Sequence, residues 1–135
     1  MNPNSEEITN GIKVLVEPEY IPNAPNQFNK NYLFSYNITI TNVGDKWAKL
    51  ISRKWVIIDS EGKEEIVEGD GVVGHQPELE PGDSFSYTSY CPLNTGWGTM
   101  EGHFNMVDKE GNEFTAKVGR FYLISTDVSN ITSLG

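Results

Sequence analysis

The chain has 135 residues, the length of a single domain, and its 10 basic and 19 acidic side chains give a net charge of −9. An acidic chain lacks the Lys and Arg excess that neutralises phosphates, so we expect it to bind no nucleic acid and no anionic membrane. Its apolar runs are too short to insert into a membrane, and its first residues contain no secretory signal. The single cysteine, Cys91, has no partner for an internal disulfide, which favours a cytoplasmic location.

Apolar and polar side chains alternate through most of the sequence, and this period of two predicts strands rather than helices. Residues 1–10 are polar and are expected to be loosely ordered. The first strand is expected over 11–19. The clearest is expected over 32–43, where one face is apolar and the other carries hydroxyl and amide groups, as in a half-solvated antiparallel sheet.

The middle of the chain predicts a bulged strand followed by a hairpin. Between residues 47 and 59 the apolar positions change parity, which indicates a β-bulge near 52–54 and places Trp55 in the core. An Asp start and a Gly end at 59–62 are typical of a tight turn, leading into a strand over 63–68.

Three more strands are expected in the last third, over 84–91, 100–107 and 113–124, with a second bulge at Gly119. About seven strands separated by turn signals predict an all-β fold, an antiparallel β-sandwich. We expect one domain over 11–125, followed by a loosely ordered tail at 126–135.

A glycine-rich stretch at 69–74, Gly-Asp-Gly-Val-Val-Gly, matches the G-x-G-x-x-G pattern that opens a helix in dinucleotide-binding folds. Prolines 77 and 81 follow too closely for the first turns of a helix, and neighbouring carboxylates repel phosphate. We therefore interpret Gly69, Gly71 and Gly74 as supplying tight backbone geometry between strands. A weaker anion site on exposed amides stays as the alternative.

The residues that carry chemistry form no catalytic or metal-binding motif. His75 and His103 are the only imidazoles, and neither lies in a recognisable nucleophile–base arrangement. Cys91 shares a face with Phe85, which predicts a small buried residue. The carboxylates around the glycine-rich stretch have no calcium-loop spacing and are interpreted as solvated surface. We expect no enzymatic activity, no cofactor and no resident metal.

Trp97 lies between two glycines in an expected loop. A large amphipathic ring in such a place is a candidate contact anchor for a partner, since Trp is enriched at binding hot spots. The alternative is that the ring folds back and closes one end of the sandwich.

Several motifs in this order resemble the ApaG domain over about residues 10–125. They are Arg53-x-Trp55-x-Ile57-x-Asp59, then Gly-Val-Val-Gly-x-Gln-Pro at 71–77, Pro81-Gly82, Tyr87-x-Ser89, Leu93, Thr95 and Gly98-x-Met100-x-Gly102.

The resemblance implies an immunoglobulin-like or fibronectin type III-like β-sandwich. It also implies a genetic link to cobalt tolerance and magnesium transport, and no established reaction accompanies the domain. Related domains attached to F-box proteins suggest protein binding, and the glycine motif has been discussed as a nucleotide or pyrophosphate site.

We therefore expect a non-enzymatic module that binds an unidentified protein through one surface formed by 69–77 and 95–98. His75, Gln76 and Trp97 are the expected contact residues, together with the three glycines of the motif. The alternative is a module that binds a nucleotide, pyrophosphate or divalent cation at the glycine-rich stretch. Monomer and homodimer both stay open.

Overall fold

The computed structural model describes residues 2–22 and 30–125, and within them it contains strands and no helix. No part of the described chain is therefore a helix that could cross a membrane. The nine strands are β1 (Ser5–Thr9), β2 (Ile12–Ile21), β3 (Tyr32–Asn42), β4 (Ala48–Asp59), β5 (Glu64–Asp70), β6 (Glu78–Leu79), β7 (Ser84–Leu93), β8 (Trp97–Val107) and β9 (Glu113–Ile124).

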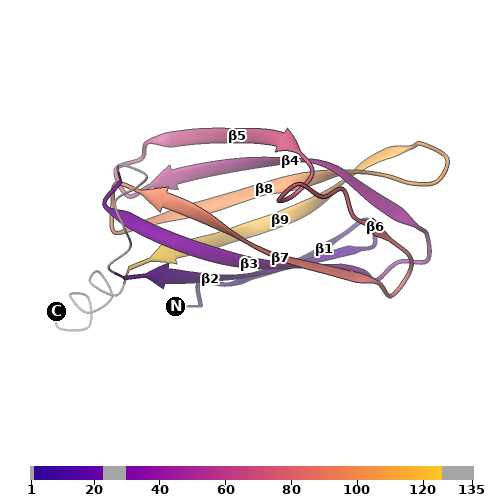
Figure 1. Ribbon diagram of the computed structural model, residues 1–135, viewed down its shortest axis with the longest axis horizontal. Coiled ribbons are helices and arrows are strands. Elements are labelled where there is room, and N and C mark those ends of the chain that lie inside the picture. Colours follow the sequence, from indigo (N-terminus) through magenta and orange to yellow (C-terminus); the bar gives the residue numbers. More distant parts are fainter. Residues whose placement is uncertain (1, 23–29, 126–135) are drawn as a thin grey trace.

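The strands form two antiparallel sheets that pack as a sandwich (Figure 1). One sheet has the order β1-β2-β3-β7 and the other the order β5-β4-β8-β9, with the short strand β6 also pairing with β4. The all-β sandwich predicted from the alternation is thus confirmed. The described chain has nine strands rather than about seven, because β1 and the two-residue β6 gave no alternating signal.

Strand β1 corrects the expectation that residues 1–10 are loosely ordered. Ser5–Thr9 pair antiparallel with β2, and Lys13 on β2 forms an ion pair with Glu6 at 3.0 Å. β1 also reaches the second sheet, where the Thr9 hydroxyl accepts a hydrogen bond from the Lys117 amide at 2.7 Å. Backbone pairing orders this polar segment, and hydrophobic alternation does not report such pairing. The expected tail at 126–135 lies outside the described residues.

One side of the sandwich is closed and the other is open. On the closed side β1 and β2 lie against β9. On the opposite side β5 and β7 are the outer strands of their sheets, and each pairs with a single neighbour in the described chain. We call this the open side, formed by Glu64–Asp70 and Ser84–Leu93.

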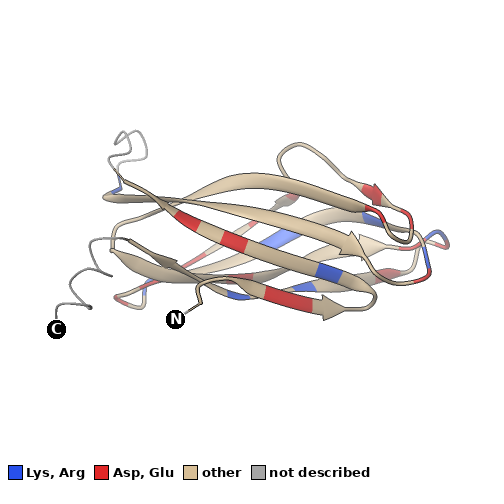
Figure 2. Cartoon of the chain, turned by 90° about the horizontal axis from the view of Figure 1, so that it is seen from below, with Lys and Arg blue, Asp and Glu red and all other residues tan. Residues whose placement is uncertain are grey.

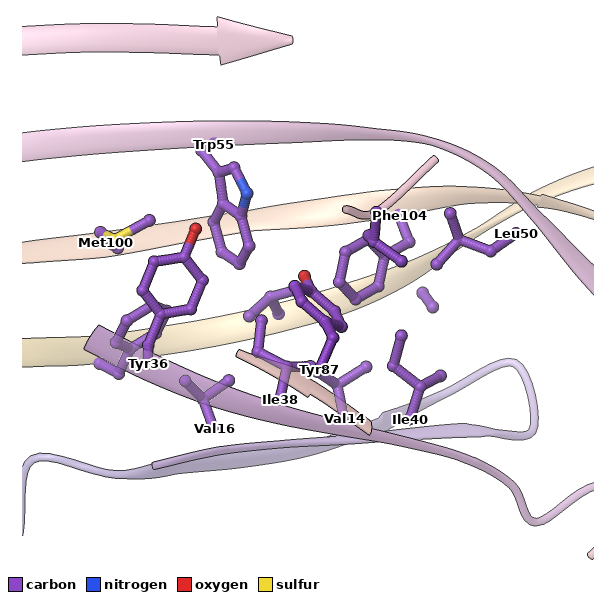
Figure 3. Packing of buried hydrophobic residues seen from close by; sticks show 14 of the residues in the cluster. Val14, Val16, Tyr36, Ile38, Ile40, Leu50, Trp55, Tyr87, Met100 and Phe104 are labelled. Carbon is purple, nitrogen blue, oxygen red and sulfur yellow. The ribbon is translucent and has the colours of Figure 1, made fainter. Parts of the chain in front are cut away.

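The core lies between the sheets and centres on Trp55 of β4 (Figure 3). Its indole ring packs edge-on against Tyr36 of β3, with 5.6 Å between ring centroids, and against Phe104 and Phe121 at 6.1 and 5.9 Å. Trp55 is 3% exposed, as its position in the sequence predicts. Such offset aromatic contacts add to the hydrophobic burial that holds the sheets together.

Both expected bulges are present. In β4 the register with β8 shifts between Leu50 and Ser52, one residue before the expected segment 52–54. In β9 the shift opposite Glu101 falls at Gly119, as expected. Each bulge restores the inward direction of the apolar positions that follow it.

The buried hydroxyl of Tyr87 gives a test of this packing. Tyr87 Oη has no hydrogen-bond partner among the described residues, whereas the Tyr36 hydroxyl bonds to Ser89. An unpaired buried hydroxyl costs free energy, so we predict that Tyr87→Phe leaves the free energy of unfolding unchanged or raises it by about 1 kcal/mol. Tyr36→Phe, the matched control, is expected to lower it by about 1 kcal/mol. Guanidinium unfolding measures both, and a loss for Tyr87→Phe as large as for Tyr36→Phe would contradict the prediction.

Candidate interaction site at the glycine-rich hairpin and the open side

The glycine-rich stretch forms a tight hairpin between β5 and β6. Val72 and His75 exchange two backbone hydrogen bonds, Val72 N to His75 O at 2.8 Å and His75 N to Val72 O at 2.9 Å. The two residues between them, Val73 and Gly74, have φ values of 42° and 83°. Positive φ at both positions defines the turn type that suits two-residue hairpins. The interpretation as tight backbone geometry between strands is confirmed, and no helix follows Gly74.

The bulge in β4 provides the attachment point for this hairpin. The carbonyl of Ile51, the extra residue of the bulge, accepts hydrogen bonds from the Gly71 amide at 2.8 Å and from the Gln76 side chain at 3.0 Å. Val72 is fully buried and joins the core cluster. A side-chain amide and a buried valine therefore fix the hairpin to the sandwich.

Arg53 fixes the entry to the hairpin. Its Nη1 atom donates to the carbonyl oxygens of Asp70 at 3.1 Å and Gly71 at 2.9 Å. A side chain at position 69 would have its Cβ 2.9 Å from the same nitrogen, so a larger residue there would displace the guanidinium. The guanidinium thus binds the backbone carbonyls at the start of the hairpin.

Val73 at the tip of the hairpin is the strained residue of this region. A β-branched side chain with positive φ is a conformational outlier, and such strain costs about 1–3 kcal/mol. Glycine or asparagine would relieve it, since both adopt positive φ readily. The Val73 side chain is 51% exposed, so burial in the core does not compensate for the strain. The hairpin holds an apolar side chain out to solvent at a cost in stability.

Two more apolar side chains are exposed along the open side. Ile66 on β5 is 53% exposed, and Tyr90 on β7 is 56% exposed. The hairpin reaches β7 as well, because the His75 ring lies 5.7 Å from the Phe85 ring between centroids. A hollow of about 300 Å³ separates the hairpin exit from the start of β7. Val73 lies at the hairpin tip, Ile66 points from the outer face of its sheet, and Tyr90 points from the outer face of the other sheet, so the three residues flank the open side on different faces.

The sequence pattern did not single out Ile66 or Tyr90 as site residues. Each occupies a position of its strand whose neighbours on the same face are polar: Ile66 lies between Glu64 and Glu68, and Tyr90 follows Ser86 and Thr88. A large apolar residue on a polar face is the signal that would have found them.

Trp97 does not share a surface with the hairpin, which corrects the expectation that 69–77 and 95–98 form one patch. Trp97 is the first residue of β8 and pairs with Ile124, whereas Gly69 lies beside Arg53, which pairs with Phe104 farther along β8. Seven residues of strand separate the two positions, a distance of about 23 Å. Trp97 is 43% exposed at the start of β8.

The other chemical candidates lie apart from one another. His103 faces a shallow hollow on the outer face of β4 and β8, with Lys54 and Asp70 at its rim. Cys91 is buried, as expected, and its burial raises the pKa of the thiol to about 12. A protonated, inaccessible thiol is a poor nucleophile. No three His, Cys, Asp or Glu side chains come together to hold a metal ion in the described ranges 2–22 and 30–125.

The hairpin offers little to an anion. The amides of Gly71, Val72 and His75 are used in backbone hydrogen bonds, which leaves only those of Val73 and Gly74 at the tip. Phosphate-binding loops instead leave successive amides free to point at the ligand. The carboxylates of Glu68 and Asp70 at the end of β5 add negative charge beside it.

The fold and this site define a small β-sandwich domain with an exposed, strained hairpin beside two free strand edges. The sequence profile of the ApaG domain matches residues 22–108. The chain is 45% identical over 122 residues to Protein ApaG of Anaeromyxobacter dehalogenans, covering 89% of this chain and 94% of that protein. It is 42% identical to Protein ApaG of Bradyrhizobium diazoefficiens over 120 residues, 89% of this chain and 92% of the relative.

Solved structures agree with the sequence comparison. The crystal structure of a Bordetella pertussis protein described as ApaA superposes with a TM-score of 0.80 at 39% identity, covering 93% of this chain and 98% of that one. The C-terminal domain of wzt, at 9% identity and a TM-score of 0.54 over 93% of this chain and 80% of that one, shares the fold alone. The chain belongs to the ApaG family.

The two inner glycines of the hairpin give a second test. A Cβ at Gly71 would overlap the carbonyl oxygen of His75, whereas a Cβ at Gly74 meets nothing within 4 Å, and both residues have positive φ. We predict that Gly74→Ala lowers the free energy of unfolding by about 1 kcal/mol through φ alone. Gly71→Ala is expected to cost about 2 kcal/mol more, because the hairpin must also open. Equal losses in guanidinium unfolding would contradict this account of the hairpin.

The buried thiol predicts an alkaline loss of stability. Burial raises the pKa of Cys91 from 9.0 to about 12, so the unfolded chain releases this proton first as the pH rises. The free energy of unfolding should therefore fall between these two pH values, by about 1.4 kcal/mol per pH unit for this thiol. Burial also raises the pKa values of Tyr36 and Tyr87, which adds a loss of the same sign at higher pH. Unfolding curves of wild type and Cys91→Ala measure the effect, and identical slopes would disprove the assignment to Cys91.

Proposed function

We propose that this chain is a non-enzymatic protein-binding module whose contact surface is the open side together with the tip of the hairpin. The observation that carries the proposal is Val73, an exposed apolar residue held in a strained conformation between the paired residues Val72 and His75. Strain that no internal packing compensates is found where a residue serves a contact outside the fold. Ile66 and Tyr90 add exposed apolar side chains on the two outer faces that flank the open side.

A protein partner fits this surface better than a small molecule. Small ligands need a concave pocket that buries most of their surface, and the two hollows beside the hairpin, of about 300 and 530 Å³, are both open to solvent rather than enclosed. Apolar side chains spread over two strand edges and a hairpin tip suit the broad contact of a protein interface. The scattered positions of His75, His103 and Cys91 favour a module without catalysis. The free, buried thiol of Cys91 is compatible with the reducing environment of the cytoplasm.

The alternative function, binding of a nucleotide, pyrophosphate or divalent cation at the hairpin, has the support of the glycine-rich sequence and little from its geometry. If the family's genetic link to cobalt and magnesium extends to this chain, we expect it to act through the partner protein. Calorimetry with ATP, Mg²⁺ and Co²⁺ separates the two functions. Saturable heat that Gly71→Ala abolishes would favour the alternative, and flat titrations up to about millimolar concentration would dismiss it.

Replacing Val73 tests the proposal, because strain and function should change in opposite directions. We predict that Val73→Asn raises the free energy of unfolding by about 1 kcal/mol, since Asn tolerates positive φ in this turn. The same substitution should weaken partner binding, because it removes the exposed apolar tip. The matched control is Val43→Asn, at a valine that is 50% exposed away from the open side.

Photo-crosslinking in cells measures the binding. Benzoylphenylalanine in place of Tyr90 is expected to form adducts with a partner protein, identified by mass spectrometry. Their yield should fall about fivefold or more with Val73→Asn and stay unchanged with Val43→Asn. Equal yields with both variants would remove the hairpin from the surface, and the absence of adducts would refute the protein-binding function. A parallel series with the crosslinker at Trp97 tests the anchor expected from the sequence.

A further inference from the structure

We propose that the free edge of β7 binds an extended segment of the partner protein as an added strand, and that this segment carries basic side chains facing the carboxylates of β5. The inference rests on the proposed function and specifies the kind of partner and its mode of binding. Strand addition obtains affinity from main-chain hydrogen bonds and specificity from alternate side chains.

The β7 edge lacks protection against pairing. Folded proteins shield free edges with charged residues, prolines or bulges. β7 carries no charged residue, its one proline is Pro92 near the end, and its register with β3 runs without a shift over Ser84–Leu93. In Figure 2 strands β3 and β7 carry no charged band, whereas β1 and β2 do. In a chain of net charge −9, this edge is where a second strand can approach without charge repulsion.

The β7 edge is already held in a regular conformation by its bonds to β3. Side chains on the outer face join β7 to β3: Thr41 to Ser84 at 2.8 Å and Thr39 to Ser86 at 3.0 Å. Asn37 extends the row by donating to the Thr88 hydroxyl at 3.0 Å. These bonds hold the edge strand on β3 before any partner binds, which lowers the ordering cost of association.

The opposite edge, formed by β5, is strongly acidic. β5 carries four carboxylates within seven residues, Glu64, Glu65, Glu68 and Asp70. Only Glu68 forms an ion pair in the described chain, with Lys54 at 3.7 Å. These charges protect β5 against strand pairing, so the two free edges of the open side differ in kind.

The carboxylates of β5 also determine the chemistry of the added strand. Glu65 lines a small hollow together with Pro92 and Leu93 at the end of β7, so it faces the space beside that edge. Lys30 and Lys63 line the same hollow, but neither lies within ion-pair distance of Glu65 in the described chain. Alternate side chains of a strand paired with β7 would point between the sheets toward β5. Apolar residues there would cover Val67 and Phe85, both partly buried against the core. A Lys or Arg in the same row would pair with Glu65.

A second copy of this chain is a poorer occupant. Antiparallel pairing of two β7 edges would join the two sheets and bring the acidic β5 strands of both copies toward one another. Like charges placed opposite each other at an interface oppose association. A basic segment gains from the same carboxylates, and the charge therefore favours a different protein.

The experiment uses a phage-displayed library of random dodecapeptides selected on the purified full chain. Selected sequences are expected to alternate apolar and polar residues and to contain Lys or Arg. Amide hydrogen exchange followed by NMR should show slower exchange at alternate residues of Ser84–Leu93 when the peptide is bound. This readout needs no variant.

Variants then test the edge and the charge separately. Thr88→Lys places a like charge on the edge and should weaken a selected basic peptide about tenfold, whereas Thr115→Lys, an exposed position on β9 away from the open side, should change the affinity less than about twofold. Glu65→Gln should weaken binding about threefold or more and reduce its salt dependence, while Glu113→Gln on β9 should do neither.

Several results would overturn the inference. Selected peptides that slow exchange at the β5 amides, or that slow exchange at no amide of β7, would place the site elsewhere. Failure to select any peptide, or sedimentation of the chain as a dimer that Thr88→Lys dissociates, would reject the basic segment as the occupant. A crosslinked partner that leaves the β7 amides exchanging freely would preserve the protein-binding function and reject strand addition, so the two failures are distinguishable.

Discussion

Trp55 occupies the point where the two sheets meet, and its surroundings constrain the rest of the fold. Its ring contacts Tyr36 from the facing sheet and Phe104 and Phe121 from its own, at centroid distances between 5.6 and 6.1 Å. The residue opposite it on β8 is Gly102, where any Cβ would overlap the carbonyl of Lys54. A large ring on one strand and bare backbone on the next set the close approach of β4 and β8.

The same strand that holds the core also builds the candidate site. Ile51 is the extra residue of the bulge in β4, and its carbonyl accepts two hydrogen bonds from the hairpin. Arg53, two residues on, binds the carbonyls at the hairpin entry. Because these supports come from a central strand, Val73 is presented on a rigid base, and strain at the tip is tolerated.

Alternation in the sequence was sufficient to predict the sandwich, the burial of Trp55 and Cys91 and the bulge at Gly119. It missed β1 because that strand is ordered by pairing, which leaves no hydrophobic period in Ser5–Thr9. The turn at Val73–Gly74 also escaped it, since valine is disfavoured at positive φ and only the hairpin's hydrogen bonds impose it. The separation of Trp97 from the hairpin depends on strand register, which spacing along the chain does not give.

The closed side links the first strand of the chain to the last. The hydroxyl of Thr9 bonds to the amide of Lys117, and the amide of Tyr122 bonds to the carbonyl of Pro3. More than a hundred residues separate these partners, so the loop they close is nearly the whole domain. Contacts of such long sequence separation slow folding. On the ribosome, the closed side cannot form until β9 has been synthesised and has left the exit tunnel. The nascent domain therefore completes its fold only after the whole domain has been translated.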